Sequence, residues 1–132
     1  MSSLREVSAR AVVLLDHGSR EPAANAQLDA LAALVAARLP GRRVAVAHME
    51  LATPTLAEAA ARCVREGARE VVVAPCFLAP GRHVREDLPR LVAELERTHP
   101  GVAFKLAAPL GEHPGLADAL AARAEEASRS RR

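Results

Sequence analysis

The sequence predicts an α/β domain in which an open, four-stranded parallel sheet carries helices on both faces. Four short runs rich in valine or alanine alternate with four longer segments of helical periodicity along the 132 residues. Three of these runs are close to continuously hydrophobic, which is typical of strands in a parallel sheet covered on both faces. Half of the residues are hydrophobic. A chain of this length and composition can bury one core, so we expect one domain.

The expected strands are the apolar runs themselves. They cover Ala11 to Leu15, Val44 to Ala47, Val71 to Pro75 and Val102 to Ala107. Right-handed crossovers between parallel strands then favour a flavodoxin-like arrangement with strand order 2-1-3-4. In that order the first and third strands flank the switch point, and a ligand is expected beyond their carboxyl ends.

The first two expected helices have clear boundaries in the sequence. The first has an apolar face and ends at Pro40-Gly41; that face consists of Leu28, Leu31, Leu34, Val35 and Leu39. The second begins with Thr53 as its cap and Pro54 in its first position, or with a capping box of Thr55 and Glu58.

The last two helices follow the third and fourth strands. Proline is costly inside a helix, so Pro89 predicts a start near Asp87, with residues 78–86 as a loop or a single turn. The final helix begins near Pro114. The apolar positions of the two helices are Leu88, Leu91, Val92 and Leu95, and then Leu116, Leu120 and Ala124. Of these elements we expect Val13, Leu31, Val72 and Leu91 in the core.

Composition excludes several classes of function. The formal net charge of +2 is too small to indicate a nucleic-acid partner, and the arginines near the C-terminus are typical of a solvated end. No run approaches the ~18 apolar residues of a membrane span. The first ten residues lack the apolar stretch of a signal peptide, so a cytoplasmic location is expected. We expect residues 1–9 and 128–132 to be flexible ends of a domain spanning 10–127.

The two cysteines indicate a reducing compartment. Cys63 and Cys76 lie in apolar surroundings without C-x-x-C spacing. Two small buried thiols are the favoured interpretation, and a disulfide or a metal site is the alternative.

Residues with chemical potential gather where the strands end. Asp16-His17-Gly18-Ser19-Arg20 follows the first strand, His48-Met49-Glu50 the second, and the third leads into a loop that holds Gly81, Arg82 and His83. Two imidazoles with a nearby carboxylate suit a first-row transition metal. Surface or capping histidines, with Gly18 and Gly81 serving only as turn residues, are the alternative. His48 is interpreted as structural, with an approach to the ligand cavity as the alternative, whereas His99 precedes a turn and His113 precedes the start of the last helix.

The order of three segments resembles that of a known family. VVLLDHGSR at 12–20, the Glu50 segment MELATP at 49–54 and VAPCFLAPGRHVREDLP at 73–89 are similar to the signatures of the short class II chelatases. These are the sirohydrochlorin cobaltochelatases and ferrochelatases. The resemblance runs from about residue 11 to residue 127. Cys76 departs from the pattern, because the family often has an aromatic residue there.

The resemblance implies a chelatase-like fold and a lyase that inserts Co²⁺ or Fe²⁺, with Ni²⁺ also open, into sirohydrochlorin or a related tetrapyrrole. That reaction belongs to cobalamin or siroheme biosynthesis and needs no permanently bound cofactor. A single domain of this size further implies a homodimer. The implied metal-binding pair is His17 and His83, and Glu50 is a metal partner or proton acceptor. Ser19, Arg20, Arg82 and Arg85 are then the residues that bind the ring carboxylates.

Two other functions remain open on the same fold, because a fold does not fix a function. One is a non-catalytic carrier of metal or tetrapyrrole. The other is a structural or regulatory module, although the sequence holds neither a phosphate-binding loop nor an acidic phospho-acceptor pocket, since Asp16 stands alone after its strand.

Overall fold

The computed structural model describes residues 9–130, and within that range strands and helices alternate along the chain. The strands are β1 (Arg10–Asp16), β2 (Arg43–His48), β3 (Glu70–Pro75) and β4 (Ala103–Leu106). The helices are α2 (Pro22–Arg38), α3 (Leu56–Arg65), α4 (Arg82–Thr98) and α5 (Pro114–Arg129). All four predicted strands are present, with ends that differ by one residue.

The sheet has the predicted topology. Its strands are parallel and lie in the order β2-β1-β3-β4. The register pairs Asp16 with His48 and Leu15 with Pro75. The segments that follow β1, β2 and β3 therefore leave the sheet at the same edge, which brings the candidate residues together.

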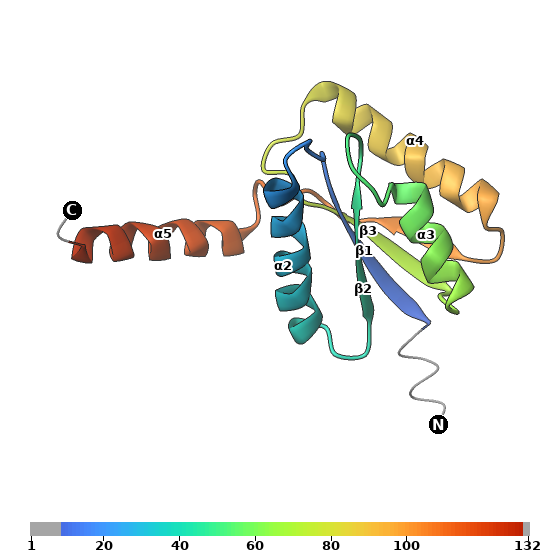
Figure 1. The fold of residues 1–132 in the computed structure, drawn as a ribbon, viewed down its shortest axis with the longest axis horizontal. Helices are drawn as coiled ribbons and strands as arrows, with labels where there is room; N and C mark the ends of the chain where they lie inside the picture. The colour runs from blue at the N-terminus through green and yellow to red at the C-terminus, as the bar shows by residue number, and fades with distance from the viewer. Residues whose placement is uncertain (1–8, 131–132) are drawn as a thin grey trace.

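The two faces of the sheet are covered unequally (Figure 1). Helices α3 and α4 pack on one face, over an extensive core that includes Val13, Val71 and Phe104. Helix α2 covers the other face alone, over Val12 and Leu14. Helices on both faces were predicted, and the difference in coverage was not.

The start of α3 follows the second of the two predicted alternatives. Thr55 accepts a hydrogen bond from the backbone N–H of Glu58, and the Glu58 carboxylate accepts one from the N–H of Thr55. This reciprocal capping box satisfies two N–H groups that have no partner inside the helix. The prediction that Thr53 caps the helix is wrong.

The start of α4 corrects another prediction. The helix begins at Arg82, so residues 82–86 are helical and Pro89 lies inside the helix. Val84 packs against the core at helical spacing from the buried Leu88, which extends the apolar face to this side of the proline. Pro89 is exposed. Pro89 has no N–H to donate to the carbonyl of Arg85, four residues earlier. Because this side of the helix faces water, a water molecule can bind that carbonyl instead, which lowers the free-energy cost of the proline.

The end of the chain departs most from expectation. Helix α5 begins at Pro114 as predicted, but it stands away from the sheet and buries none of its residues (Figure 1). Val13 is buried, Val72 and Leu91 are partly buried, and Leu31 is 39% exposed, so its placement in the core was wrong. Residues 1–8 and 131–132 of the expected flexible ends lie outside the described range. No helix between residues 9 and 130 is long and apolar enough to cross a membrane.

Candidate functional site

The segments after β1 and β2 hold a histidine and a carboxylate against each other. His17 Nε2 lies 2.8 Å from Glu50 Oε1, and both side chains are more than half exposed. Backbone hydrogen bonds continue past the strand ends, from Met49 N to Asp16 O and from Glu50 N to His17 O. These bonds hold the two segments side by side, so the pair is positioned by the backbone of the sheet edge.

Gly18 makes this close approach possible. Its φ is +92°, in the left-handed region that L side chains rarely adopt. A Cβ atom here would overlap the carbonyl oxygen of Glu50 and would lie 3.2 Å from the Cβ of His48. The glycine is therefore required by the approach of the Glu50 segment as well as by its own turn.

A second histidine–carboxylate pair lies directly beneath the first. His48 is 3% exposed, and its Nδ1 lies 2.6 Å from Asp16 Oδ1. With the carboxylate ionised, the imidazole is the donor. The structural interpretation of His48 is consistent with this burial, but its partner was missed. The signal lay in the strand ends, because Asp16 and His48 end adjacent parallel strands.

The segment after β3 forms the third side of the site. The ring of Phe77 meets the imidazole of His17 edge to face, with the ring centroids 6.4 Å apart. The N–H of Cys76 donates to the carbonyl of Leu15, which ties this segment to β1. Burial raises the pKa of the Cys76 thiol, with a further contribution from the charge of Asp16. Sequence reasoning placed Phe77 in this loop without giving it a role.

The remaining basic candidates lie on the first turn of α4. Arg82, His83 and Arg85 are exposed, and Arg82 pairs with Glu86 of the same helix at 3.1 Å. Among the described residues, no group of three or more His, Cys, Asp or Glu side chains is arranged to hold a metal. His83 is therefore not gathered with His17 and Glu50 into one three-ligand group.

Ser19 and Arg20 follow the histidine and lead into α2. The hydroxyl of Ser19 accepts a hydrogen bond from Glu21 N. Its backbone N–H donates to Asn25 Oδ1, and its carbonyl accepts from Asn25 Nδ2. Ser19 is thus engaged in shaping the turn, whereas the Arg20 side chain is exposed.

The helices that start beside the site differ from the others at their N-termini. α2 and α4 begin without a side-chain cap, whereas Thr55 caps α3 and His113 caps α5. Uncapped helix starts present backbone N–H groups and a positive dipole end to an anion. At the start of α2, Pro22 has no N–H and Ala24 N already donates to Glu21 O, so the start of α4 is the place beside this edge that offers N–H groups to a carboxylate.

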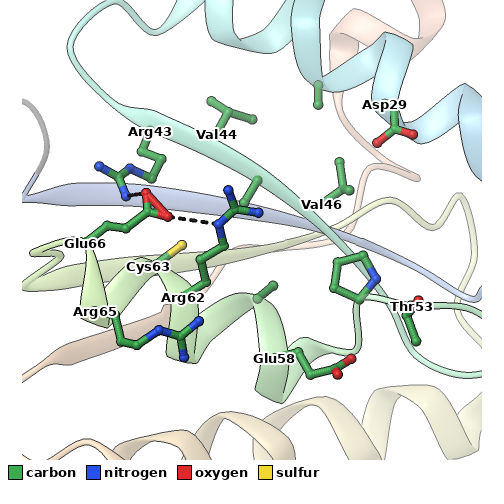
Figure 2. A pocket seen from close by; sticks show the side chains of 14 residues that line it. Asp29, Arg43, Val44, Val46, Thr53, Glu58, Arg62, Cys63, Arg65 and Glu66 are labelled. Carbon is green, nitrogen blue, oxygen red and sulfur yellow. Dashed lines mark hydrogen bonds and ion pairs between the residues drawn. The ribbon is translucent and has the colours of Figure 1, made fainter.

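A cavity of about 880 Å³ opens elsewhere, along the free side of β2 between α2 and α3 (Figure 2). None of the predicted site residues lines it. Glu66 forms ion pairs with both Arg43 and Arg62 across it. Over the whole lining, three carboxylates balance three guanidinium groups, and no histidine is present, so the cavity does not compete with the exposed His17–Glu50 pair as a site for chemistry.

The chain matches a known protein family and named relatives. The family model described as CbiX matches residues 11–127. The chain is 38% identical over 109 residues to a chloroplastic sirohydrochlorin ferrochelatase of Arabidopsis thaliana, covering 83% of this chain and 48% of the relative. It is 31% identical over 123 residues to a sirohydrochlorin cobaltochelatase of Methanococcoides burtonii, covering 87% of this chain and 94% of the relative. The chain thus spans about half of the Arabidopsis relative and nearly all of the archaeal one.

A solved structure agrees in fold and length. A CbiX protein of cobalamin biosynthesis from Marinobacter aquaeolei VT8 superimposes with a TM-score of 0.79 at 36% identity. The match covers 92% of this chain and 99% of that one. The family match, the relatives and the shared fold agree, and the chain belongs to the CbiX family.

Proposed function

We propose that this chain inserts a divalent metal ion, Co²⁺ or Fe²⁺ with Ni²⁺ as a further candidate, into sirohydrochlorin or a related tetrapyrrole. The reaction would serve cobalamin or siroheme biosynthesis. The observation that carries the proposal is the exposed His17–Glu50 pair at the carboxyl edge of the sheet. Relatives named as sirohydrochlorin cobaltochelatase and ferrochelatase support the same activity.

The spacing of the pair suits a metal ion that is held lightly. Metal–ligand bonds to nitrogen and oxygen are about 2.0–2.1 Å long, so two donors at right angles around one ion lie about 2.9 Å apart. His17 Nε2 and Glu50 Oε1 are separated by 2.8 Å. Two protein donors leave the other coordination positions of the ion open, and ring nitrogens can enter them.

Insertion also requires a base. Two pyrrole N–H protons leave the ring as one divalent ion enters, so the charge balances. A positioned carboxylate can accept such a proton and pass it to solvent. Glu50 is more than half exposed, which gives both the ring and water access to its oxygens. We therefore assign Glu50 to proton acceptance and the His17–Glu50 pair to delivery of the ion.

The ring is held by its carboxylates in this proposal. Arg20, Arg82 and Arg85 are exposed around the site and can bind carboxylates in pairs of hydrogen bonds. The uncapped start of α4 adds backbone N–H donors. Ser19 contributes the turn that leads to Arg20. His83, in the first turn of α4, supplies the second imidazole, and it binds the ion when the ring is also bound.

The proposal includes an oligomeric state and a cellular location. The single domain forms one wall of a cleft for a macrocycle, so a homodimer is needed to supply the second wall. The thiols of Cys63 and Cys76 are both free, which fits the reducing conditions of the cytoplasm.

The test is an absorbance assay of the purified protein with sirohydrochlorin and each ion in turn. His17→Ala and Glu50→Gln are expected to lower the insertion rate at least ~100-fold, the scale associated with misplacing or removing one catalytic group. His83→Ala should also lower the rate. His99→Ala, at the far end of α4, is the control and should retain the parent rate.

Arg20→Ala separates ring binding from metal delivery. It should raise the KM for the tetrapyrrole with little change in the KM for the ion, and Arg97→Ala, at the exposed end of α4, should change neither. Parent-like insertion by His17→Ala would contradict the proposed metal delivery. Stoichiometric binding of metal or tetrapyrrole without turnover would favour the non-catalytic carrier.

A further inference from the structure

Helix α2 carries apolar residues around its whole circumference, with Asn25 and Gln27 as its uncharged polar side chains. Of its 17 residues only Asp29 and Arg38 are charged, and only Leu28 is buried. Leu31 is 39% exposed and Leu34 is 58% exposed. A helix that is hydrophobic on all sides is normally covered on all sides. The outer surface of α2 is therefore without a partner among residues 9–130.

The sheet beside α2 is also incompletely covered. Val72 and Ala74 of β3 lie on the α2 face and are only partly buried. Lys105 of β4 pairs in register with Val72, so it lies on the same face, and it is exposed. In an open α/β sheet both faces are covered by helices. The half of this face formed by β3 and β4 lacks its helix.

These two surfaces adjoin. Asp29 and Ala32 line the cavity at the β2 edge, which fixes the flank of α2 that faces this edge. At 100° per residue, Leu31 and Leu34 lie on the opposite flank, toward β3, in a stripe whose two ends are the exposed Gln27 and Arg38. We call the surface formed by Leu31, Leu34, Val72 and Ala74 the α2 groove.

Helix α5 carries a surface that matches the α2 groove. Leu116, Leu120, Ala124 and Ala127 share one side of the helix, and Leu120 is 65% exposed. Of the charged residues of α5, Asp118, Glu125 and Arg129 lie on the opposite side, whereas Arg123 borders the apolar side and pairs with Glu126 at 3.0 Å. Figure 1 shows this helix standing away from the body of its own chain. Its apolar side is thus unpartnered as well.

The connection before α5 fixes the direction in which the helix leaves. Ala107 N donates to Val73 O at 2.9 Å, and Leu110 N donates to Phe77 O at 3.2 Å. Gly111 packs so closely on the carbonyl of Leu78 that a Cβ atom would overlap it. His113 then caps the first turn through Gly115 N. The cap moves with α5, whereas the contacts of Ala107, Leu110 and Gly111 hold the connection against β3 and the segment after it and oppose a return of α5 to its own α2 groove.

We propose that α5 of each chain packs into the α2 groove of a second copy, so that two chains exchange their last helices about a twofold axis. A helix of 16 residues is about 24 Å long. Such a contact removes on the order of 300–400 Å² from each of its two surfaces, so two reciprocal contacts bury roughly 1,200–1,600 Å² in all. This area reaches the range of stable interfaces, whereas one contact alone does not. The exchange specifies how the homodimer of the proposed function is built.

The first test compares charges placed on the two sides of each helix. The parent protein should have twice the 13.9 kDa mass of one chain in light scattering. Leu120→Glu and Leu34→Glu should each reduce this to the mass of one chain, with unchanged helical circular dichroism. Ala122→Glu and Ala33→Glu, on the outer sides of the same helices, should remain dimeric. A monomeric parent, or a dimeric Leu120→Glu variant, overturns the proposal.

The second test distinguishes exchange from folding back. The variant Leu34→Cys/Leu120→Cys, with Cys76→Ala to remove the native thiol from the groove, should form a disulfide-linked dimer on a non-reducing gel. A disulfide-linked single chain, or no disulfide, contradicts the exchange. Metal insertion enters neither readout. A dimer that tolerates Leu120→Glu would therefore refute the helix exchange and leave the proposed chelatase activity to its own assay.

Discussion

Replacing Gly18 by alanine should disable the site more than it destabilises the fold. The residue has a φ of +92°, where an L side chain costs about 1–2 kcal/mol. The added Cβ would lie 3.0 Å from the carbonyl carbon of Glu50, and it would overlap the oxygen bonded to that carbon. Carbon atoms pack about 3.5–4.0 Å apart, so the Glu50 peptide must move by about 1 Å or more.

That movement sets the expected magnitudes. It strains the hydrogen bond from Glu50 N to His17 O, whose loss costs about 1 kcal/mol. The total destabilisation of Gly18→Ala should therefore be about 2–3 kcal/mol. A displacement of about 1 Å at a reacting group lowers the rate on the order of 100-fold. The insertion rate should fall by that factor while the protein remains folded.

Gly67→Ala is the matched control for this prediction. Gly67 has a φ of +103°, but nothing lies within 4 Å of its added Cβ. Only the backbone cost of about 1–2 kcal/mol applies there, and the insertion rate should stay at the parent value. The two variants are compared by urea unfolding and by the absorbance assay. Equal stability losses together with parent activity in Gly18→Ala would refute the reasoning.

Three further predictions concern the surroundings of the site. Asp16→Asn should lower the free energy of unfolding by about 1–3 kcal/mol, because buried His48 loses its charged partner. The control is Asp118→Asn on α5, which should leave the free energy of unfolding unchanged in urea titrations. Burial raises the pKa values of the Cys63 and Cys76 thiols, so less thiolate is present at a given pH and alkylation should be slow until the protein unfolds. Rapid stoichiometric labelling of the native protein, measured by mass spectrometry, would count against this. Insertion should slow on acidification, because a protonated imidazole cannot bind the ion; a flat rate profile through the acid range would speak against imidazole donors.

The sheet and its functional edge could be predicted because local patterns determine them. Continuous apolar runs identify buried parallel strands, and the order of the strands places His17 and Glu50 at one edge. The start of α4 was misplaced because Pro89 was weighed without knowing that its side of the helix faces water. Predicting the contact between Asp16 and His48 requires the register between β1 and β2, which cannot be read from the sequence.

The course of α5 could not be predicted from periodicity. The amphipathic pattern identifies a helix with one apolar side, but it does not say which chain covers that side. The exit direction is set by contacts between distant segments, such as Leu110 N with Phe77 O. The exposure of Leu31 has the same origin, because the pattern on α2 marks Leu31 as apolar but does not show whether another element covers it.

The ion pairs beside the cavity along β2 have a consequence for how the sheet can grow. An edge strand exposes unpaired backbone groups to which a strand of another molecule can add, and charged side chains on the edge oppose this addition. Arg43 of β2 pairs with Glu66, which also pairs with Arg62, so an incoming strand would have to separate these charges. The opposite edge, β4, has only four residues and carries Lys105. Both edges thus resist strand addition, which opposes extension of the sheet into a fibre.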